Sequence, residues 1–200
     1  MGAVPIFQTT RSRAMIERLS FMLYLLLLAM PAQAIESLVI QLPAPPSVSS
    51  HHVSAESVGL MVVDARKNAL PGLNVDGEAL RIENNLQAEL QAYVERGLID
   101  RGWIIQSFSD TPNHALKVEL LDLSYRAHKK MLRTGIEVQA VVLATARRQT
   151  TTLKKTFRAK NSYEVPLTPS KQKNASMLRK ALLQALNTML DDPEVQKMLR

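Results

Sequence analysis

The sequence predicts an α+β fold: an antiparallel sheet of about five to six strands, with two main helices packed on one face and a short C-terminal helix. Two observations lead to this class. Apolar and polar residues alternate along several long runs in the second half of the chain, a pattern typical of half-buried strands. Two other segments place apolar residues at spacings of three and four, which is typical of amphipathic helices.

The N-terminal 34 residues predict a secretory signal peptide. Arg11, Arg13 and Arg18 precede ten uncharged, mostly aliphatic residues over 21–30. An apolar stretch of ~7–15 residues behind a basic flank is the pattern of such signals. The stretch is too short to cross a bilayer, which takes ~20 residues. We therefore expect export, and no transmembrane span in the mature chain.

The end of this signal is also predicted. Ala32 and Ala34 are small residues that fit the two pockets of a signal peptidase, so the mature chain is expected to begin at Ile35. Met15 is an alternative start of translation, because it would place the apolar stretch nearer the N-terminus.

The net charge indicates possible partners, and the absence of cysteine excludes several kinds of site. The formal net charge is +7, and residues 1–34 contribute three Arg and one Glu to it, so residues 35–200 carry +5. This excess is compatible with anionic lipid, glycan or protein surfaces. Cysteine is absent, which excludes disulfides, thiolate metal sites and a cysteine nucleophile, and leaves no cysteine to accept a lipid.

Residues 35–57 are expected to form a short strand followed by a connection. The apolar run 38–42 ends at prolines, and 43–57 is rich in Pro, Ser and His, which is typical of a solvated segment. Residues 58–200 are expected to form a single α+β domain. Its first strand is predicted over 58–63, and 78–82 is a weaker strand candidate.

A helix is expected over 85–101. Asn84 or Asn85 can accept the free backbone amides at its start, and Gly102 follows as a C-terminal stop. Two further helices are expected near the C-terminus, where Asp192-Pro193 is a typical helix start. These two helices should cover 170–190 and 193–199.

Four strands are expected between the helices, joined as an antiparallel meander because the connections are short and polar. They cover 103–108, 116–125, 135–146 and 151–163. The alternation of apolar residues slips at Leu121, which predicts a β-bulge there.

Several motifs together resemble the YajG-type lipoprotein family of Gram-negative bacteria. They are VGLMVVDAR, LIDRGW, HALKVELLDLSYR, GIEVQAVVLATARR, KKTFRAKNSYEVP and LLQALNTMLDDPEVQKML, between Val58 and the C-terminus. The resemblance implies an exported envelope protein, and it carries no molecular function with it. The family pattern includes a lipid-accepting cysteine at the cleavage site, whereas residues 31–35 contain none.

Asp64 and Arg66 rank first among candidate ligand contacts. They end the predicted strand 58–63 with Ala65 between them, so both side chains should point to one side. One interpretation is a recognition pair in which Arg66 binds an anionic group. The other is an ion pair, or a turn fixed by Asp64 accepting backbone N–H bonds.

Basic residues form the second group of candidate contacts. Lys154, Arg158 and Lys160 share one side of a predicted strand, either as a contact for anionic lipid or glycan or as an ordinary solvated face. Nucleic acid is not an expected partner, because aromatic residues make up only 4% of the chain. A second basic cluster occupies a predicted hairpin loop and comprises Arg126, His128, Lys129, Lys130 and Arg133.

The sequence contains no catalytic motif of the hydrolase, metalloprotease, P-loop or dinucleotide-binding type. His51-His52 lies far along the chain from the other histidines, so no metal and no cofactor is expected. We expect a non-catalytic periplasmic binding or accessory module, in contact with an envelope protein or the outer membrane. The alternatives are a small-ligand or lipid carrier with a cleft between helices and sheet, and, less favoured, a hydrolase. The oligomeric state stays open.

Overall fold

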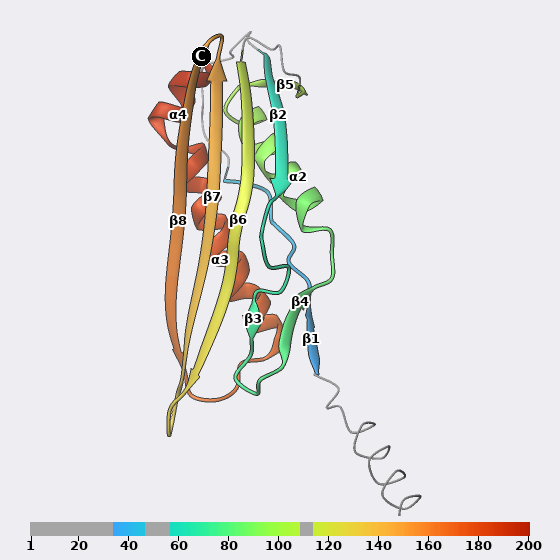
Figure 1. Cartoon of the computed structure of the whole chain (residues 1–200), viewed down its shortest axis with the longest axis vertical. Coiled ribbons are helices and arrows are strands. Elements are labelled where there is room, and N and C mark those ends of the chain that lie inside the picture. Colours follow the sequence, from blue (N-terminus) through green and yellow to red (C-terminus); the bar gives the residue numbers. More distant parts are fainter. Residues whose placement is uncertain (1–33, 47–56, 109–113) are drawn as a thin grey trace, which may run out of the picture. The chain divides into compact units, whose positions relative to one another are not determined.

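Three long strands form the larger part of a mixed sheet (Figure 1). They are β6 (His114–Lys129), β7 (Thr134–Arg148) and β8 (Thr151–Val165), and they pair as an antiparallel meander. The register between β6 and β7 shifts between Leu120 and Asp122, so the predicted bulge is confirmed. The computed structural model describes residues 34–46, 57–108 and 114–200, and Ala34–Arg200 forms one compact unit.

Two shorter strands lie end to end along the other side of β6. β2 (Ser57–Asp64) runs parallel to the first half of β6, and β3 (Gly72–Leu73) runs parallel to its second half. Beyond β2 lies β5 (Ile104–Ser107), again parallel. Beyond β3 lies β4 (Ala79–Ile82), which pairs with β1 (Ile35–Leu38) at the sheet edge.

The expectation of an antiparallel sheet is therefore only partly right. Among the described residues, four of the seven strand pairings are parallel. The strands predicted as neighbours in a hairpin, β5 and β6, instead lie on opposite sides of β2 and run in the same direction.

Strand length explains why the short connection between β5 and β6 was misleading. A short connection normally indicates a hairpin, because a parallel return must run back along the strand. Here β5 has only four residues and ends beside Leu60 of β2, while β6 begins its pairing beside Gly59. The chain therefore needs to run back by only about one residue along β2 before β6 begins. A short connection can span this distance, so β5 and β6 can be parallel.

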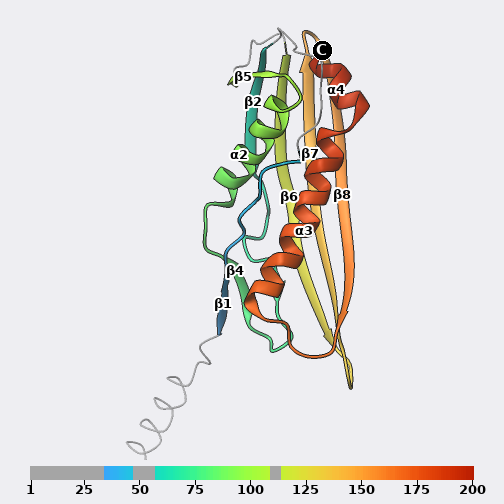
Figure 2. The same ribbon diagram turned by 180° about the vertical axis from the view of Figure 1, so that it is seen from behind.

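Three helices cover one face of the sheet (Figure 2). α2 (Leu86–Ile99) packs on β2 and β5, and α3 (Lys171–Leu190) packs across β7, β8 and β1. α4 (Pro193–Leu199) packs against β7 and β6. The predicted layer of helices on one face is confirmed.

The helix ends follow from local chemistry. The Asn85 side chain accepts a hydrogen bond from the Ala88 amide (3.1 Å), so Asn85 rather than Asn84 caps α2. Asp192 caps α4 by accepting from the amides of Glu194 and Val195, with Pro193 in the first turn. These caps set the starts of both helices close to their predicted positions.

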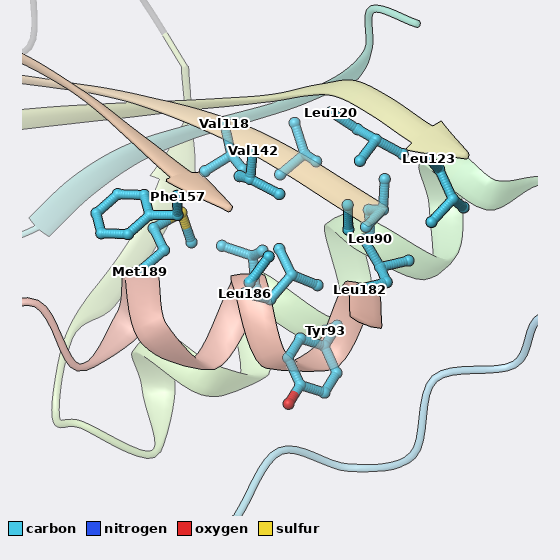
Figure 3. Packing of buried hydrophobic residues seen from close by; sticks show 14 of the residues in the cluster. Leu90, Tyr93, Val118, Leu120, Leu123, Val142, Phe157, Leu182, Leu186 and Met189 are labelled. Carbon is cyan, nitrogen blue, oxygen red and sulfur yellow. The ribbon is translucent and has the colours of Figure 1, made fainter. Parts of the chain in front are cut away.

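The core lies between the helices and the sheet (Figure 3). Apolar residues that recur at helical spacing on α2 and α3 and alternate along β7 are at most 1% exposed there, so the predicted amphipathic patterns are confirmed. These residues are Leu90, Val94, Leu182 and Leu186 on the helices and Val138, Ala140 and Val142 on β7.

Residues 39–46, which we call the strap, lead from β1 across the helical layer (Figure 2). Asn84 holds the strap with two hydrogen bonds: its Oδ1 accepts from the Ile40 amide (3.0 Å), and its Nδ2 donates to the Ile40 carbonyl (2.7 Å). Glu89 of α2 accepts from the Leu42 amide (3.0 Å). The strap is therefore fixed against α2, and its residues Gln41, Leu42 and Pro43 also face α3.

Candidate functional site

A groove with a volume of about 630 Å³ lies between the strap and α3. Its α3 wall consists of Ser176, Arg179, Lys180 and Leu183, at successive spacings of three, one and three along the helix. Such spacings place side chains on one side of a helix. The strap wall consists of Gln41, Leu42 and Pro43.

This groove combines an apolar lining with positive charge. Leu42, Pro43 and Leu183 supply the apolar surface, while Arg179 and Lys180 have no acidic partner within the described parts of the chain. α3 has no acidic residue in its first turn and contains none up to Leu190. The groove is therefore complementary to a ligand with negative charge and apolar groups.

A smaller hollow lies on the other side of the strap, against α2. Its volume is about 110 Å³, and Glu89, Tyr93 and Arg96 line its α2 wall. The Tyr93 hydroxyl donates to Asn187 Oδ1 of α3 (2.6 Å), which ties the two helices together beneath the strap. The strap thus separates two hollows on one helical surface.

Asp64 and Arg66 form a closed ion pair after β2. Arg66 Nε lies 2.8 Å from Asp64 Oδ1, Nη2 lies 2.8 Å from Oδ2, and Nη1 donates to the Ala69 carbonyl (3.3 Å). The Arg66 side chain is only 7% exposed. Partial burial would raise the pKa of the Asp64 carboxyl, but the hydrogen bonds and charge of Arg66 outweigh it and lower that pKa. Binding an anion with Arg66 would require this pair to open, and that role stays a prediction.

Lys154, Arg158 and Lys160 lie exposed on β8, in phase with one another and opposite to the buried Phe157 and Ala159. Lys160 pairs with Glu137 (3.1 Å), and this hydrogen bond and charge lower the pKa of Glu137. For Lys154 and Arg158, no acidic partner is found among the described residues. They occupy the sheet face away from the helices, so the structure does not bring them together with the groove.

A buried polar network links β1, α3, β6 and the turn before β4, and sequence reasoning missed it. Asn174 is 0% exposed; its Nδ2 donates to Glu36 Oε1 (3.1 Å), and its Oδ1 accepts from the Tyr125 hydroxyl (2.7 Å). Asn74 donates to Glu36 Oε2 (2.6 Å). Burial and the Glu36 charge raise the pKa of Tyr125, which keeps its hydroxyl a donor.

Two signals in the sequence could have revealed this network. Asn174 lies on the apolar stripe of α3, in line with Leu178 and Ala181, and a polar residue there must find a buried partner. Glu36 alternates in phase with the buried Leu38 and Ile40. All four residues of the network are buried and bond to one another, so the network links these elements within the core.

Within 34–46, 57–108 and 114–200, no group of His, Asp or Glu is arranged to hold a metal ion. In the same segments no helix has the length and apolar character needed to cross a bilayer. His51-His52 and the signal residue Ala32 lie outside the described residues, while Ala34 is the first described residue and is exposed.

The sequence over residues 43–200 matches the model of a family described as uncharacterized lipoprotein. The chain belongs to this family. The expected membership of a lipoprotein family is thus confirmed, and it supports an exported, envelope-associated protein. No match is found among curated proteins.

Solved structures of low sequence identity are similar to this lipoprotein family member. A DUF330 protein of Xanthomonas campestris has a TM-score of 0.52 and 14% identity, covering 77% of this chain and 91% of that one. An uncharacterized protein has a TM-score of 0.46 and 13% identity, covering 82% and 99%. A lipoprotein of Neisseria meningitidis has a TM-score of 0.32 and 11% identity, covering 66% and 99%. At 14% identity, the likeness to the Xanthomonas campestris protein concerns the fold alone.

Proposed function

We propose that the protein is a non-catalytic binding module of the periplasm, which holds an acidic, extended segment of an envelope protein in the groove between the strap and α3. The observation that carries this proposal is the pair Arg179 and Lys180, which lies beside apolar side chains without an acidic partner in the described structure. Exposed apolar surface bordered by charge is typical of protein-binding sites.

The composition of the groove supports a binding role rather than catalysis. Its lining contains one hydroxyl, that of Ser176, and no His, Asp, Glu or Cys. A nucleophile needs an adjacent base within hydrogen-bond reach, and general acid–base catalysis needs a group that titrates near neutral pH. The groove residues offer charge and apolar contact, which are the means of recognition.

A carrier of small apolar ligands is less well supported. Such carriers enclose most of the ligand surface in a cavity. Between the helices and the sheet, Leu182, Leu186 and Val142 are fully buried and pack against one another (Figure 3). The two hollows beside the strap lie on the surface instead.

Site-specific crosslinking in cells tests the proposal. A photo-crosslinking amino acid at Ser176 should form an adduct with an envelope protein, whereas the same group at Thr152 on the far sheet edge should not. The double reversal R179E/K180E should abolish the adduct. The matched control K171E/K173E changes the same charge on exposed positions of the same helix, outside the groove, and should preserve it.

Two results would contradict this function. An adduct that forms equally well in R179E/K180E would show that the groove charges do not recognise the partner. An adduct with lipid alone would support a carrier instead. Thermal unfolding of each variant verifies that a lost adduct does not reflect a lost fold.

A further inference from the structure

The turn between β6 and β7 exposes its two apolar residues almost completely. Met131 is 103% exposed and Leu132 is 86% exposed, the largest values among the large hydrophobic residues described. The turn is closed by a hydrogen bond from the Lys130 amide to the Arg133 carbonyl (2.8 Å), and the strands behind it stay paired to Lys129 and Thr134. Both apolar side chains are thus held out into solvent by an ordered hairpin.

Positive charge surrounds these two residues. Lys129 and Lys130 precede them and Arg133 follows them. Arg126 lies in β6, three residues before Lys129. Two carboxylates lie near this cluster. Glu164 of β8 lies 3.1 Å from Arg133 and 3.5 Å from Lys130, and their hydrogen bonds and charges lower its pKa. Glu137 of β7 lies opposite Arg126. Two carboxylates therefore offset only part of the charge of Arg126, Lys129, Lys130 and Arg133.

The place of this hairpin in the fold adds a third observation. Its apex lies at the same end of the unit as the first residue of β1, as both views show (Figures 1 and 2). The turn between β7 and β8 lies at the opposite end. A surface that meets the beginning of the mature chain would therefore also meet the apex.

We infer that Met131 and Leu132 insert into the headgroup region of a bilayer that contains anionic lipid, with Lys129, Lys130 and Arg133 bound to lipid headgroups. Apolar side chains ringed by Lys and Arg are the combination that holds proteins at membrane interfaces. A two-residue apex is far too small for a stable protein interface, which buries at least ~1,000 Å². A bilayer accepts it because insertion requires no matching shape.

This contact uses neither the strap nor α3. Failure of the membrane contact therefore leaves the groove proposal untouched, and failure of the groove proposal leaves the membrane contact untouched.

A fluorescent label at the apex tests the inference in the full chain. Because the chain has no cysteine, Leu132→Cys gives a single site for a polarity-sensitive fluorophore. With equimolar phosphatidylcholine–phosphatidylglycerol vesicles, its emission should shift to the blue and be quenched by lipid-attached quenchers. The same label at Thr150→Cys, in the turn at the opposite end, should remain in water.

Charge reversals define what holds the apex. K129E/K130E in the labelled chain should weaken the lipid titration by at least about tenfold, since each Lys near an anionic membrane strengthens binding several-fold. The matched reversal K154E/R158E on the outer sheet face should leave the titration unchanged. The shift should disappear in ~1 M salt, where charges are screened within ~3 Å.

Any of four results would overturn the inference. The label at position 132 could show no shift with anionic vesicles, or labels at 132 and 150 could shift equally. The reversal K154E/R158E could weaken the titration as much as K129E/K130E, which would assign the contact to the sheet face. A shift without vesicles that grows with protein concentration would assign the apex to contact between copies.

Discussion

Replacing Asn174 with alanine should cost about 3–5 kcal/mol of unfolding free energy, although Asn174 is a single polar side chain on α3. The reason is the burial of its partners: the Tyr125 hydroxyl (2.7 Å) and Glu36 Oε1 (3.1 Å) each lose a hydrogen bond where water is excluded. An unsatisfied buried group costs ~1–3 kcal/mol, and a charged one costs more. The cavity left by the side chain adds to this loss.

A double-mutant cycle isolates the hydrogen bond itself. Tyr125→Phe alone should cost ~1–3 kcal/mol, because it leaves the Asn174 side-chain oxygen without its donor. Y125F/N174A removes both the donor and the acceptor of this hydrogen bond, so neither is left unpaired. The double variant should therefore lose ~1–2 kcal/mol less unfolding free energy than the sum of the losses in the single variants. Gln172→Ala, at an exposed position of the same helix, should change stability by less than ~0.5 kcal/mol.

Urea unfolding monitored by tryptophan fluorescence measures these values. Trp103 is the single tryptophan and is 5% exposed in the fold, so its emission reports the loss of the core. If N174A cost under ~1 kcal/mol, it would behave like a surface variant. If the coupling were near zero, the hydroxyl and the amide would not share a buried bond. Either result would refute the reasoning.

Other predictions concern single positions. Gly72→Ala should cost more than ~2 kcal/mol of unfolding free energy. An added Cβ would lie 2.1 Å from the Tyr125 carbonyl oxygen, and the φ of +154° is unfavourable for alanine. Gly135→Ala, whose Cβ would have ordinary contacts, serves as the control in the same urea assay. Leu186→Ala should cost ~2–5 kcal/mol by the same measurement, since Leu186 is 0% exposed. Stability should fall as pH rises above the usual tyrosine pKa of about 10. The pKa of Tyr125 is raised in the fold, so in this pH range only the unfolded state releases the Tyr125 proton. In a pH series of urea midpoints, Tyr125→Phe should make this fall less steep. N-terminal sequencing of the exported protein should read Ile-Glu-Ser, and Ala34→Glu should leave the precursor uncleaved.

Each of these has a result that would count against it. Equal losses in the two glycine variants would mean that the close approach at Gly72 is not rigid. A Leu186→Ala loss below ~1 kcal/mol would place that helix face outside the core. An alkaline fall as steep in Tyr125→Phe as in the unaltered chain would assign it to other groups. An intact N-terminus on exported protein would remove the cleavage site from Ala34.

Local patterns predicted the C-terminal half of the fold well. The phases of β7 and α3, the bulge after Leu120 and the cap at Asp192 follow from residues within a few positions of one another. The parallel half could not be predicted in the same way. Whether β5 pairs with β2 or with β6 depends on contacts between segments far apart in sequence, and a four-residue strand carries too little periodicity to decide it.

The candidate sites follow the same division. The clustering of cations at the β6–β7 turn is visible in the sequence, because the turn residues are consecutive. The groove is not visible, because Leu42 and Leu183 come from distant segments that only the fold brings together. Nor does the sequence show that Arg66 donates its hydrogen bonds to Asp64 and Ala69, since an exposed recognition pair and a closed ion pair have the same spacing.

The link between Glu36 and Asn174 has a consequence for the order in which the chain completes itself. These residues are 138 positions apart, and they join the first strand to the last long helix. A ribosome or export channel delivers the chain from its N-terminus, so Glu36 can meet Asn74 early, whereas its Oε1 meets Asn174 only when nearly the whole domain has emerged. Contacts of such long sequence separation form late in folding. In an interrupted copy that stops before Asn174, Glu36 Oε1 lacks its donor, and burying this unpaired carboxylate oxygen disfavours the docking of β1. We therefore expect β1 to dock less firmly in unfinished copies of this protein than in a chain that includes α3.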